Sequence, residues 1–533
     1  MSVRPWAALC LAVSMTLTPA AAASASTPPA EFGSDWHDPI TADPPIVTPP
    51  TASCTVQIVD AAFADFTPYT GAYTPPAQCP GPWAKVVLRM DGQVAGRQFD
   101  RLGYLTVGGV TVFKTSTPEP SPAGIAWRVE KDVTGYSTLF AAPQPVSSLI
   151  GNVVNETYTG VLHVQAYLTF YQADAAHPAP ADGADDVQGL SSVHAEGQAQ
   201  VGGLTVAPNT ERLVAEVYAT GSGGGCEEFW YLTTPPEAGY SCPADHGPYR
   251  EVQINVDGVP AGIAAPYPHV YTGGWSNPFL WYVLPAPRAF DIQPIRYDLS
   301  PFAGLLTDGR EHQISVSVLG VPAGQSGWDV PVTLLGWRDA GSARVTGSLT
   351  RVASAPVTNT SVYADGADTD TVTTTGGHRL TVAGFVQTSH GRVDTTVVRE
   401  VANTSSHRWG AEENPDALTA EWTDHTTVTV SSGGSRDVRR TDRRYAVDGA
   451  ISIDAANRLT TTLTLADGCV TITGGIPVRT DNTYTGTATW TLGVPRDQRH
   501  ATATSTLRYK IAGPGQDYDR TLTAVNGELT VGG

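Results

Sequence analysis

The feature of this sequence that most limits its possible folds is an alternation of side-chain character along short segments. Between Gly160 and Tyr171, every even-numbered position from 162 to 170 is apolar, and the odd-numbered positions face the other way in a strand. Similar segments run over 85–90, 249–256 and 311–319, and 102–113 contains a Gly108-Gly109 turn. Long amphipathic helical patterns are absent from the sequence. We therefore expect an all-β protein.

The length of this β-rich chain predicts several domains. It has 533 residues, and one core rarely grows past roughly 250–300 residues. Residues 341–533 are rich in Thr, with hairpin signals at Asp448-Gly449 and Asp467-Gly468. We predict two β-sandwiches and a third β-rich region. The expected divisions are a signal peptide (1–25), a Pro-, Ser- and Thr-rich tether (26–53), a first sandwich (54–175), a linker or loop (176–190), a second sandwich (191–340) and a C-terminal β-rich domain (341–533).

The first 25 residues have the pattern of a secretory signal peptide. Arg4 precedes an apolar run over 6–17, which is shorter than the roughly 20 residues of a membrane span. Ala23-Ser24-Ala25 fits the small-residue cleavage site. A lipoprotein signal at Cys10 is the alternative, but Leu9 stands where a small residue is needed. We expect a secreted, soluble protein with no membrane partner.

Cleavage would leave five cysteines in an oxidising compartment, where they can pair. Cys54 with Cys79 and Cys226 with Cys242 are the local pairs, and each disulfide would contribute about 3 kcal/mol through loop closure. Cys469 is left over, and we interpret it as a buried thiol rather than a nucleophile because no His stands near it in the sequence. The absence of C-x-x-C argues against thiolate zinc sites and redox motifs.

Charge and missing motifs exclude several function classes. The chain has 32 Lys and Arg against 51 Asp and Glu, a net charge of -19, which argues against nucleic acid and anionic membranes as partners. It contains no H-E-x-x-H, G-x-S-x-G, P-loop or EF-hand motif, and its 12 His show no metal-ligand spacing. We expect neither a metal nor an organic cofactor. No oligomeric state follows from the sequence.

Carboxylate chemistry remains, and three carboxylates stand in aromatic or glycine-rich settings. Asp100 ends the stretch Gly-Arg-Gln-Phe-Asp before a predicted strand, Glu156 precedes the strand at 160–171, and Glu228 follows Cys226 and Glu227. At strand ends, such side chains can meet in a cleft between two sandwiches, with aromatic rings as a sugar-stacking wall. One carboxylate could then help water attack while another serves the leaving group of a sugar linkage.

These residues carry a resemblance to the peptide-N-glycanase A family, whose members remove N-linked glycans from asparagine. The likeness runs from about Cys54 to beyond residue 340 and more weakly to the C-terminus. Its motifs lie at consistent spacing. The matching stretches are Gly96–Arg101, Gly124–Thr134, Thr157–Phe170, Glu227–Tyr231 and Tyr271–Trp281.

A more distant likeness, to peptide-N-glycanase F, implies two tandem jelly rolls with the active site at or near their interface. Its catalytic aspartate follows Trp and precedes Arg, as Asp100 lies between Phe99 and Arg101. Its two glutamates lie in Gly-Cys-Ala-Glu-Trp and Thr-Glu-Thr-Trp contexts, which are similar to those of Glu228 and Glu156. This chain departs from it by having Phe or Tyr where that enzyme has three tryptophans. The substrate-binding residues that we infer are Arg101, Phe229, Trp230, Tyr158, Trp281 and Arg288.

Each assignment has a plainer alternative. Asp100 could form a surface ion pair with Arg101, and Glu156 lies in a glycosylation sequon that would suit a solvated surface. We prefer Glu228 over Glu227 because it holds the matching place in the motif and would share the pleat side of Cys226 in a strand. Trp230, Trp281, Tyr271 and Trp275 could be core residues rather than a sugar platform. Arg288 would orient a carboxylate or a sugar.

The resemblance therefore implies a secreted hydrolase that cleaves the amide bond between N-acetylglucosamine and asparagine in glycopeptides or glycoproteins. Asp100 would be the central acid/base, Glu228 would activate water or hold the chitobiose core, and Glu156 would orient the substrate. Two rivals remain open at this stage. One is a non-catalytic glycan-binding or adhesion protein, because jelly rolls also serve as lectins, and the other is an endo-acting glycosidase.

Overall fold

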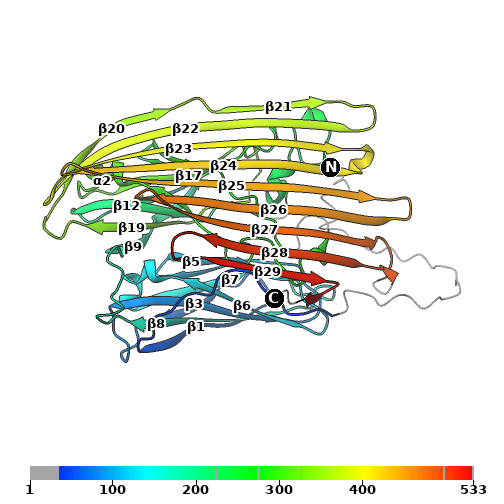
Figure 1. Ribbon diagram of the computed structural model, residues 1–533, viewed down its shortest axis with the longest axis horizontal. Helices are drawn as coiled ribbons and strands as arrows, with labels where there is room; N and C mark the ends of the chain where they lie inside the picture. The colour runs from blue at the N-terminus through cyan, green and yellow to red at the C-terminus, as the bar shows by residue number, and fades with distance from the viewer. Residues whose placement is uncertain (1–34, 223–224, 273–276, 326, 496–497, 531–533) are drawn as a thin grey trace.

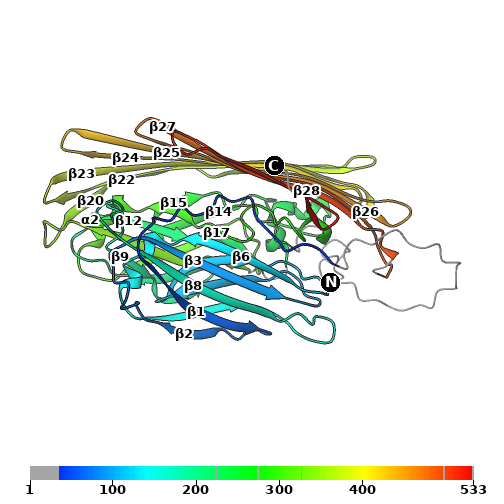
Figure 2. The ribbon, with the colours of Figure 1, turned by 60° about the horizontal axis from the view of Figure 1, so that its bottom comes forward.

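The computed structural model describes residues 35–222, 225–272, 277–325, 327–495 and 498–530. The predicted signal peptide lies outside these described residues, as does Trp275. The chain folds almost entirely into β-strands, so the all-β prediction is confirmed. Two sandwiches lie side by side, and one broad sheet packs on the second of them (Figures 1 and 2).

The first sandwich consists of two four-stranded antiparallel sheets with the strand orders β1-β8-β3-β6 and β2-β7-β4-β5. Every connection except the β4–β5 hairpin therefore crosses from one sheet to the other. In β8 the even-numbered residues from 162 to 170 are buried, as their alternation predicts. The strands are β1 Ser53–Phe63, β2 Tyr69–Tyr73, β3 Trp83–Val94, β4 Leu102–Val107, β5 Val110–Ser116, β6 Ile125–Asp132, β7 Gln144–Ile150 and β8 Leu162–Gln172.

The second sandwich pairs a sheet of order β10-β11-β17-β14-β15 with one of order β16-β12-β19-β9, and β13 pairs with β18 beside them. β9 lies inside the predicted linker over 176–190 and pairs with β19. The jelly-roll connectivity of the sandwiches stays a prediction. The strands are β9 Asp186–Gly189, β10 Ser191–Glu196, β11 Ala199–Leu204, β12 Thr210–Val217, β13 Thr220–Gly221, β14 Glu251–Val256, β15 Val259–Ala264, β16 Ile295–Asp298, β17 His312–Leu319, β18 Trp328–Asp329 and β19 Val332–Arg338.

The described residues of 346–495 and 498–530 form a single antiparallel sheet of eleven strands. Buried and exposed residues alternate along its strands, which are up to 19 residues long. The buried residues form the inner face of the sheet, and this face joins the core of the sandwiches. The strands are β20 Thr346–Ser354, β21 Thr358–Ala364, β22 Asp370–Thr388, β23 Gly391–Trp409, β24 Asp416–Ser432, β25 Ser435–Ile453, β26 Arg458–Thr473, β27 Ile476–Thr491, β28 Thr502–Ala512, β29 Tyr518–Val525 and β30 Glu528–Thr530.

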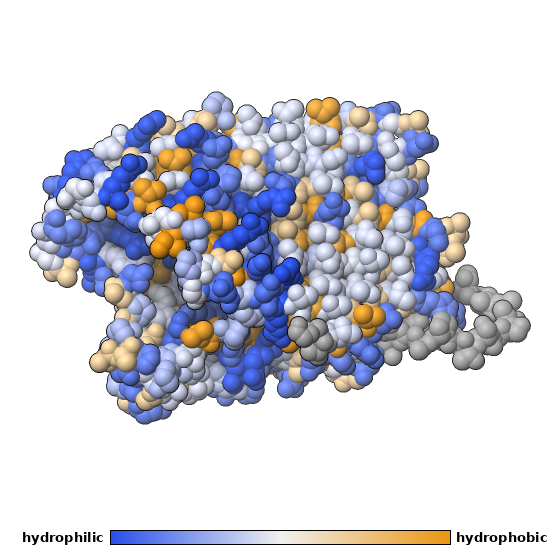
Figure 3. All heavy atoms as spheres, in the orientation of Figure 1, coloured by the Kyte–Doolittle hydropathy of each residue, from blue (hydrophilic) through white to orange (hydrophobic). Residues whose placement is uncertain are grey.

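The outer face of this sheet is shown in Figure 3, where polar and weakly polar side chains predominate and apolar ones are scattered. Thr373 and Thr375 are two of its exposed residues. The contrast between the two faces explains the Thr-rich composition of this region, since Thr combines a high strand propensity with a polar group for the solvated side.

Two hairpin predictions in this region are wrong. Asp448-Gly449 lies within β25 and Asp467-Gly468 lies within β26. The tight turns instead use Gly433-Gly434 and Gly474-Gly475, where both residues of each pair have a positive φ and so fit the two-residue hairpin loop that joins such strands. The Asp467 side chain faces the second sandwich, where Arg288 binds it.

Short helical turns connect the strands. The only four-residue α-helix in the described ranges is α2, and the others are 3-10 turns. They are η1 Thr134–Tyr136, η2 Leu139–Ala141, η3 Cys226–Leu232, η4 Pro236–Ala238, η5 Pro278–Leu280, η6 Ser300–Phe302, α2 Ala303–Leu306 and η7 Ala411–Glu413. None of the helices in the described part of the chain is long and apolar enough to cross a membrane.

The described part of the N-terminal segment, 35–52, is extended and packs across the protein. The Trp36 ring stacks on Tyr282, with 3.7 Å between centroids. The His37 N–H donates a hydrogen bond to the Gly527 carbonyl, and the Tyr518 hydroxyl donates to the Ala42 carbonyl. This segment therefore links the second sandwich to the last strands of the broad sheet.

Both predicted disulfides are present, Cys54–Cys79 and Cys226–Cys242. Cys469 is the free cysteine of the described residues and is half-buried.

Candidate active site at the junction of the sandwiches

Asp100 lies just before β4, at the edge of the first sandwich, and is half-buried. The neighbouring Arg101 donates hydrogen bonds to the side-chain oxygens of Asn152 (3.2 Å) and Gln98 (2.5 Å). Burial lowers the pKa of Arg101, while the charge of Asp100 acts in the opposite direction. Arg101 is therefore fixed by amide groups, and its charge remains close to Asp100.

The Glu156 loop lies against this same segment. The Gly160 N–H donates to the Arg97 carbonyl, and the Arg97 N–H donates to the Thr159 hydroxyl. The ring of Tyr158 lies 5.0 Å from that of Phe99, between centroids. Glu156 itself is exposed, on a turn where Asn155 accepts hydrogen bonds from the following backbone. Two of the three predicted carboxylate segments therefore meet at one edge of the first sandwich.

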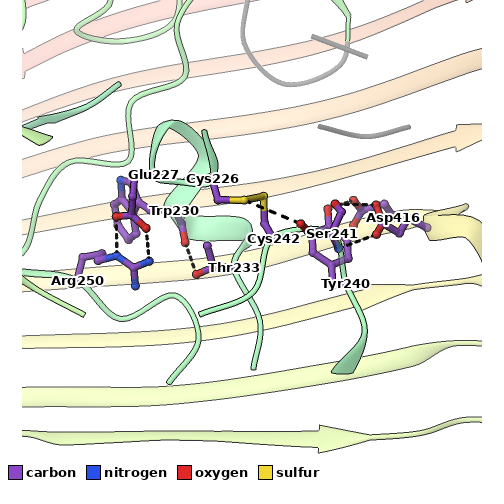
Figure 4. Close-up of a disulfide and its surroundings, with 10 residues drawn as sticks. Cys226, Glu227, Trp230, Thr233, Tyr240, Ser241, Cys242, Arg250 and Asp416 are labelled. Carbon is purple, nitrogen blue, oxygen red and sulfur yellow. Dashed lines mark hydrogen bonds and ion pairs between the residues drawn. A yellow bond between two sulfur atoms is a disulfide. The ribbon is translucent and has the colours of Figure 1, made fainter. Parts of the chain in front are cut away.

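The third segment is the 3-10 turn η3, not a strand, so the pleat argument for choosing Glu228 is wrong. The structure separates the two glutamates in another way. Glu227 is fully buried and accepts hydrogen bonds from Arg250 at 2.6 and 3.0 Å and from the Trp328 indole at 2.6 Å (Figure 4). These hydrogen bonds therefore hold the Glu227 side chain in the interior. Glu228 is half-buried.

The disulfide beside η3 anchors this turn to the broad sheet. Cys226 is bonded to Cys242, and the preceding Ser241 donates hydrogen bonds from its N–H and hydroxyl to Glu413. The Tyr240 hydroxyl donates to Asp416 at 2.8 Å (Figure 4). The C-terminal region therefore supports the loop that carries Glu228.

Buried polar contacts hold the two sandwiches together next to these segments. Lys114, on β5, has no exposed surface and donates to Thr220 and Asp329 of the second sandwich, both at 2.6 Å. Burial lowers the pKa of Lys114, and the Asp329 carboxylate opposes this. Lys131 likewise donates to Asp291 and to the Tyr218 hydroxyl. Contacts of this kind fix the relative position of residues from the two sandwiches.

Tyr271 shows that the carboxylates share one neighbourhood. Its ring packs with Tyr218, Ile292 and Leu102, the residue two positions after Asp100. Burial raises the pKa of the Tyr271 hydroxyl well above its ordinary value, and the charges of Glu228, Asp100 and Asp329 raise it further. Asp100 from one sandwich and Glu228 from the other therefore act on the same phenol.

A hydrogen-bonded path connects Tyr271 to the Asp100 segment. Thr272, the next residue, donates from its hydroxyl to the Thr117 carbonyl. The Thr117 hydroxyl in turn accepts a hydrogen bond from the Arg101 N–H at 2.9 Å. The Tyr271 hydroxyl donates to the Gly221 carbonyl, which lies on β13 beside η3. Tyr271 is thus the structural link between the two catalytic candidates.

Several predicted substrate contacts lie elsewhere. Trp230 is 2% exposed and packs on Trp422 and Trp328, and Trp281 is 1% exposed and stacks on Tyr484 of the broad sheet. Both tryptophans are core residues in this structure, as the alternative interpretation holds. Arg288 forms a two-point ion pair with Asp467 of the sheet. Phe229 and Tyr158 are half-buried.

The sequence interpretation missed Asp329 and Lys114. Trp328-Asp329 repeats the aromatic–aspartate pairing of Phe99-Asp100, and Lys114 interrupts an otherwise apolar and hydroxyl-bearing strand, which is an unusual place for a lysine. Both features are visible in the sequence and could have identified these two residues as candidates. Their pairing across the sandwich junction depends on tertiary structure.

The chain has relatives among known proteins. The chain is 29% identical over 400 residues to peptide-N4-(N-acetyl-β-glucosaminyl)asparagine amidase A of Prunus dulcis, and the match covers 69% of each protein. A solved structure titled "Structure of PNGF-II in P21 space group" aligns with 54% of this chain and 66% of that chain, at 13% identity and a TM-score of 0.36. Residues 41–352, more than half of the chain, match the sequence profile of one family, and the protein therefore belongs to the peptide N-acetyl-β-D-glucosaminyl asparaginase amidase A family.

Proposed function

We propose that this protein hydrolyses the side-chain amide that joins N-acetylglucosamine to asparagine in N-glycosylated peptides or proteins. Its family membership supports the reaction class, and the name of the almond relative supports the bond. The observation that carries the residue assignment is that the Tyr271 segment links the Asp100 and Glu228 segments: the Tyr271 hydroxyl donates to the Gly221 carbonyl beside η3, and Thr272 donates to Thr117, whose hydroxyl accepts from the Arg101 N–H.

The proposed reaction uses two carboxylates and water. Glu228 accepts a proton from a water molecule, and the water oxygen bonds to the side-chain carbonyl carbon of the glycosylated asparagine. Asp100, in its protonated form, donates a proton to the amide nitrogen as the carbon–nitrogen bond breaks. The products are an aspartate-containing peptide and a glycosylamine, which water then hydrolyses to the free sugar and ammonia. The two carboxylates exchange their protons through solvent before the next cycle.

Other residues would serve as positioning groups. Arg101 is held in place by Gln98 and Asn152, so it can orient Asp100 or a sugar hydroxyl without a large loss of side-chain entropy. Tyr158 and Phe229 are half-buried aromatics next to Phe99 and Glu228, respectively, and would contact the sugar rings. Glu156, on its exposed turn, would contact the substrate on the side of the first sandwich.

A mass spectrum of a defined N-glycopeptide after incubation with the protein tests this function. The expected product is the glycan-free peptide with aspartate in place of asparagine. A peptide that keeps one sugar residue would indicate an endo-acting glycosidase, and an unchanged peptide would contradict an enzymatic role and favour glycan binding. Substrates with and without core fucose would also define the glycan preference.

We also propose that the protein is exported. The support is the sequence of residues 1–25, with Arg4, the short apolar run and Ala23-Ser24-Ala25. N-terminal sequencing of the protein recovered from culture medium should begin at Ser26. A protein that stays in the cell with Met1 or Ser2 at its N-terminus would contradict this proposal.

A further inference from the structure

We propose that Glu211, Asp339 and His390 form a binding site for a first-row divalent transition metal ion such as Zn²⁺. Within the described ranges, these three side chains are a group whose potential ligand atoms all lie within 4.8 Å of one another. Glu211 lies on β12 and Asp339 directly follows β19, both in the second sandwich. His390 is at the tip of the β22–β23 hairpin of the broad sheet. The ion would therefore cross-link two layers of the fold.

The ligand geometry is close to that of a bound ion. The His390 Nε2 atom lies 3.4 Å from the Glu211 Oε2 atom, which suits two ligands on one centre. Zinc bonds to imidazole nitrogen and carboxylate oxygen are about 2.0–2.2 Å, so ligand atoms on one zinc lie within about 4.4 Å of each other. His390 is 53% exposed, and a small rotation of this side chain would close the remaining gap.

Asp339 is prepared as a ligand by its own hydrogen bonds. Its carboxylate is 4% exposed and accepts hydrogen bonds from the Gly341 N–H, the Ser389 N–H and the Ser389 hydroxyl. A carboxylate offers about four lone-pair sites, so these three bonds fix its orientation and leave a site for a metal. Hydrogen bonds of this type commonly orient metal ligands. They also dock the hairpin tip, which carries His390, onto the second sandwich.

Glu211 points to the same centre and has an unsatisfied oxygen. Its Oε2 atom is buried and accepts no hydrogen bond. The pairing of β12 with β19 shifts register between Thr210 and Arg212, so Glu211 is the bulged residue. Bulges re-aim side chains and are frequent next to functional sites. This oxygen therefore faces the His390 imidazole at 3.4 Å without a hydrogen bond being made to it.

The local charge balance also favours a cation. Glu211 and Asp339 bring two carboxylates together, and the His390 imidazole contacts Glu211. The guanidinium of Arg338, adjacent to Asp339 in sequence, is engaged by Asp186. Two carboxylates and one imidazole suit Zn²⁺ better than Ca²⁺ or Mg²⁺, which prefer oxygen ligands alone. The site is separate from Asp100 and Glu228 and does not depend on the proposed reaction.

The test is direct metal binding by the full chain after removal of metals with a chelator and removal of the chelator. Isothermal titration with Zn²⁺ should show one tight equivalent, and Zn²⁺ should raise Tm. His390→Ala should weaken this binding by at least tenfold while leaving the circular dichroism spectrum unchanged, because the side chain lies at an exposed hairpin tip. His425→Ala is the matched control, since His425 lies in the same sheet, is similarly exposed and pairs with Asp442. It should bind like the wild type.

Two results would overturn the proposal. One is the absence of a tight equivalent in the wild type, and the other is equal affinity in wild type and His390→Ala, which would indicate adventitious binding to other surface groups. Anomalous diffraction from crystals grown with Zn²⁺ gives an independent readout. A peak among Glu211, Asp339 and His390 is expected, and zinc peaks only at other places would contradict the site.

Discussion

Glu227 and Arg250 form a fully buried two-point ion pair directly beside Glu228, the proposed catalytic residue. Neither partner has side-chain exposure in this pair. Arg250 also donates to the Gly247 and Tyr249 carbonyls, and the Trp328 indole donates to Glu227. The two adjacent glutamates therefore have different environments. Glu227 holds η3 in the interior, and Glu228, the next residue of this turn, lies near the junction of the sandwiches.

This pairing predicts different effects for two neighbouring substitutions. Glu227→Ala leaves Arg250 as an unpaired buried charge, so the free energy of unfolding should fall by about 3–5 kcal/mol. Glu228→Gln should change Tm little and lower kcat by about 10²-fold or more, as expected for a catalytic carboxylate. Thermal melts and glycopeptide kinetics on both variants check this. Full activity in Glu228→Gln would show that the wrong glutamate has been assigned.

Asp100→Asn should leave the fold intact and lower the rate of glycan release by about 10²–10⁴-fold. The change keeps the volume of the side chain and removes its acid/base capacity. Asp91→Asn is a suitable control because Asp91 is another aspartate of the first sandwich, ion-paired with Arg128 on the strand face. The control should retain the wild-type rate. If Asp100→Asn keeps more than a third of that rate, Asp100 is not the central acid/base.

Arg288→Met should lower stability rather than substrate affinity. Arg288 is bound to Asp467 through two hydrogen bonds and lies over the rings of Tyr267 and Tyr445. Its loss leaves Asp467 as an unpaired, largely buried carboxylate, which should cost about 3–5 kcal/mol. KM for a glycopeptide should stay within about twofold at a temperature where the variant is folded. A large rise in KM with unchanged Tm would restore a substrate-binding role.

The strands of the sandwiches could be predicted from the sequence because burial on one face enforces a period of two residues. The alternation at 160–171 and the turn at Gly108-Gly109 correspond to β8 and the β4–β5 hairpin. The same signals failed in the broad sheet. There Asp448-Gly449 and Asp467-Gly468 lie inside long strands, because tertiary contacts such as Arg288–Asp467 override local turn preference.

For the site, sequence motifs could identify the segments but not the environments of individual side chains. Glu227 and Glu228 are chemically identical in the sequence, and only the fold places Arg250 against the first of them. In the sequence, Trp230 and Trp281 are compatible both with a core and with a sugar platform, and the core interpretation is favoured. The broad sheet buries both tryptophans, and no local sequence pattern predicts that a sheet will cover another domain.

Opening the Cys226–Cys242 disulfide should reduce both stability and turnover. A loop of this length contributes about 3 kcal/mol by restricting the unfolded chain. The double variant Cys226→Ser/Cys242→Ser also releases η3 from the loop that Glu413 and Asp416 hold, so kcat should fall even where the protein is folded. The Cys54–Cys79 pair lies in the first sandwich, and its removal should lower stability alone. An equal loss of kcat in both double variants would contradict a specific role for Cys226–Cys242.

His269 should make the protein less stable as the pH falls below about 6.5. Its ring is buried and stacks on Tyr271, and burial, together with the charges of Arg288 and Lys114, lowers its pKa from 6.5 to about 3. The unfolded chain therefore binds a proton at this residue that the folded protein does not, and stability rises with pH between these two values. From pH 6.5 to pH 5 the expected loss is about 2 kcal/mol.

His269→Phe keeps a ring that can stack on Tyr271 and removes the titrating group, so it should reduce the loss of stability between pH 7.5 and pH 5 in urea unfolding. His312→Gln provides a control of opposite sign. Burial lowers the pKa of His312, but its hydrogen bonds to Asp257 and Asp308 outweigh this and raise it. Its contribution is therefore present at low pH and lost as the pH rises, and its removal should steepen the loss at pH 5. Identical pH slopes for wild type and His269→Phe would mean that this histidine is not held neutral in the folded protein.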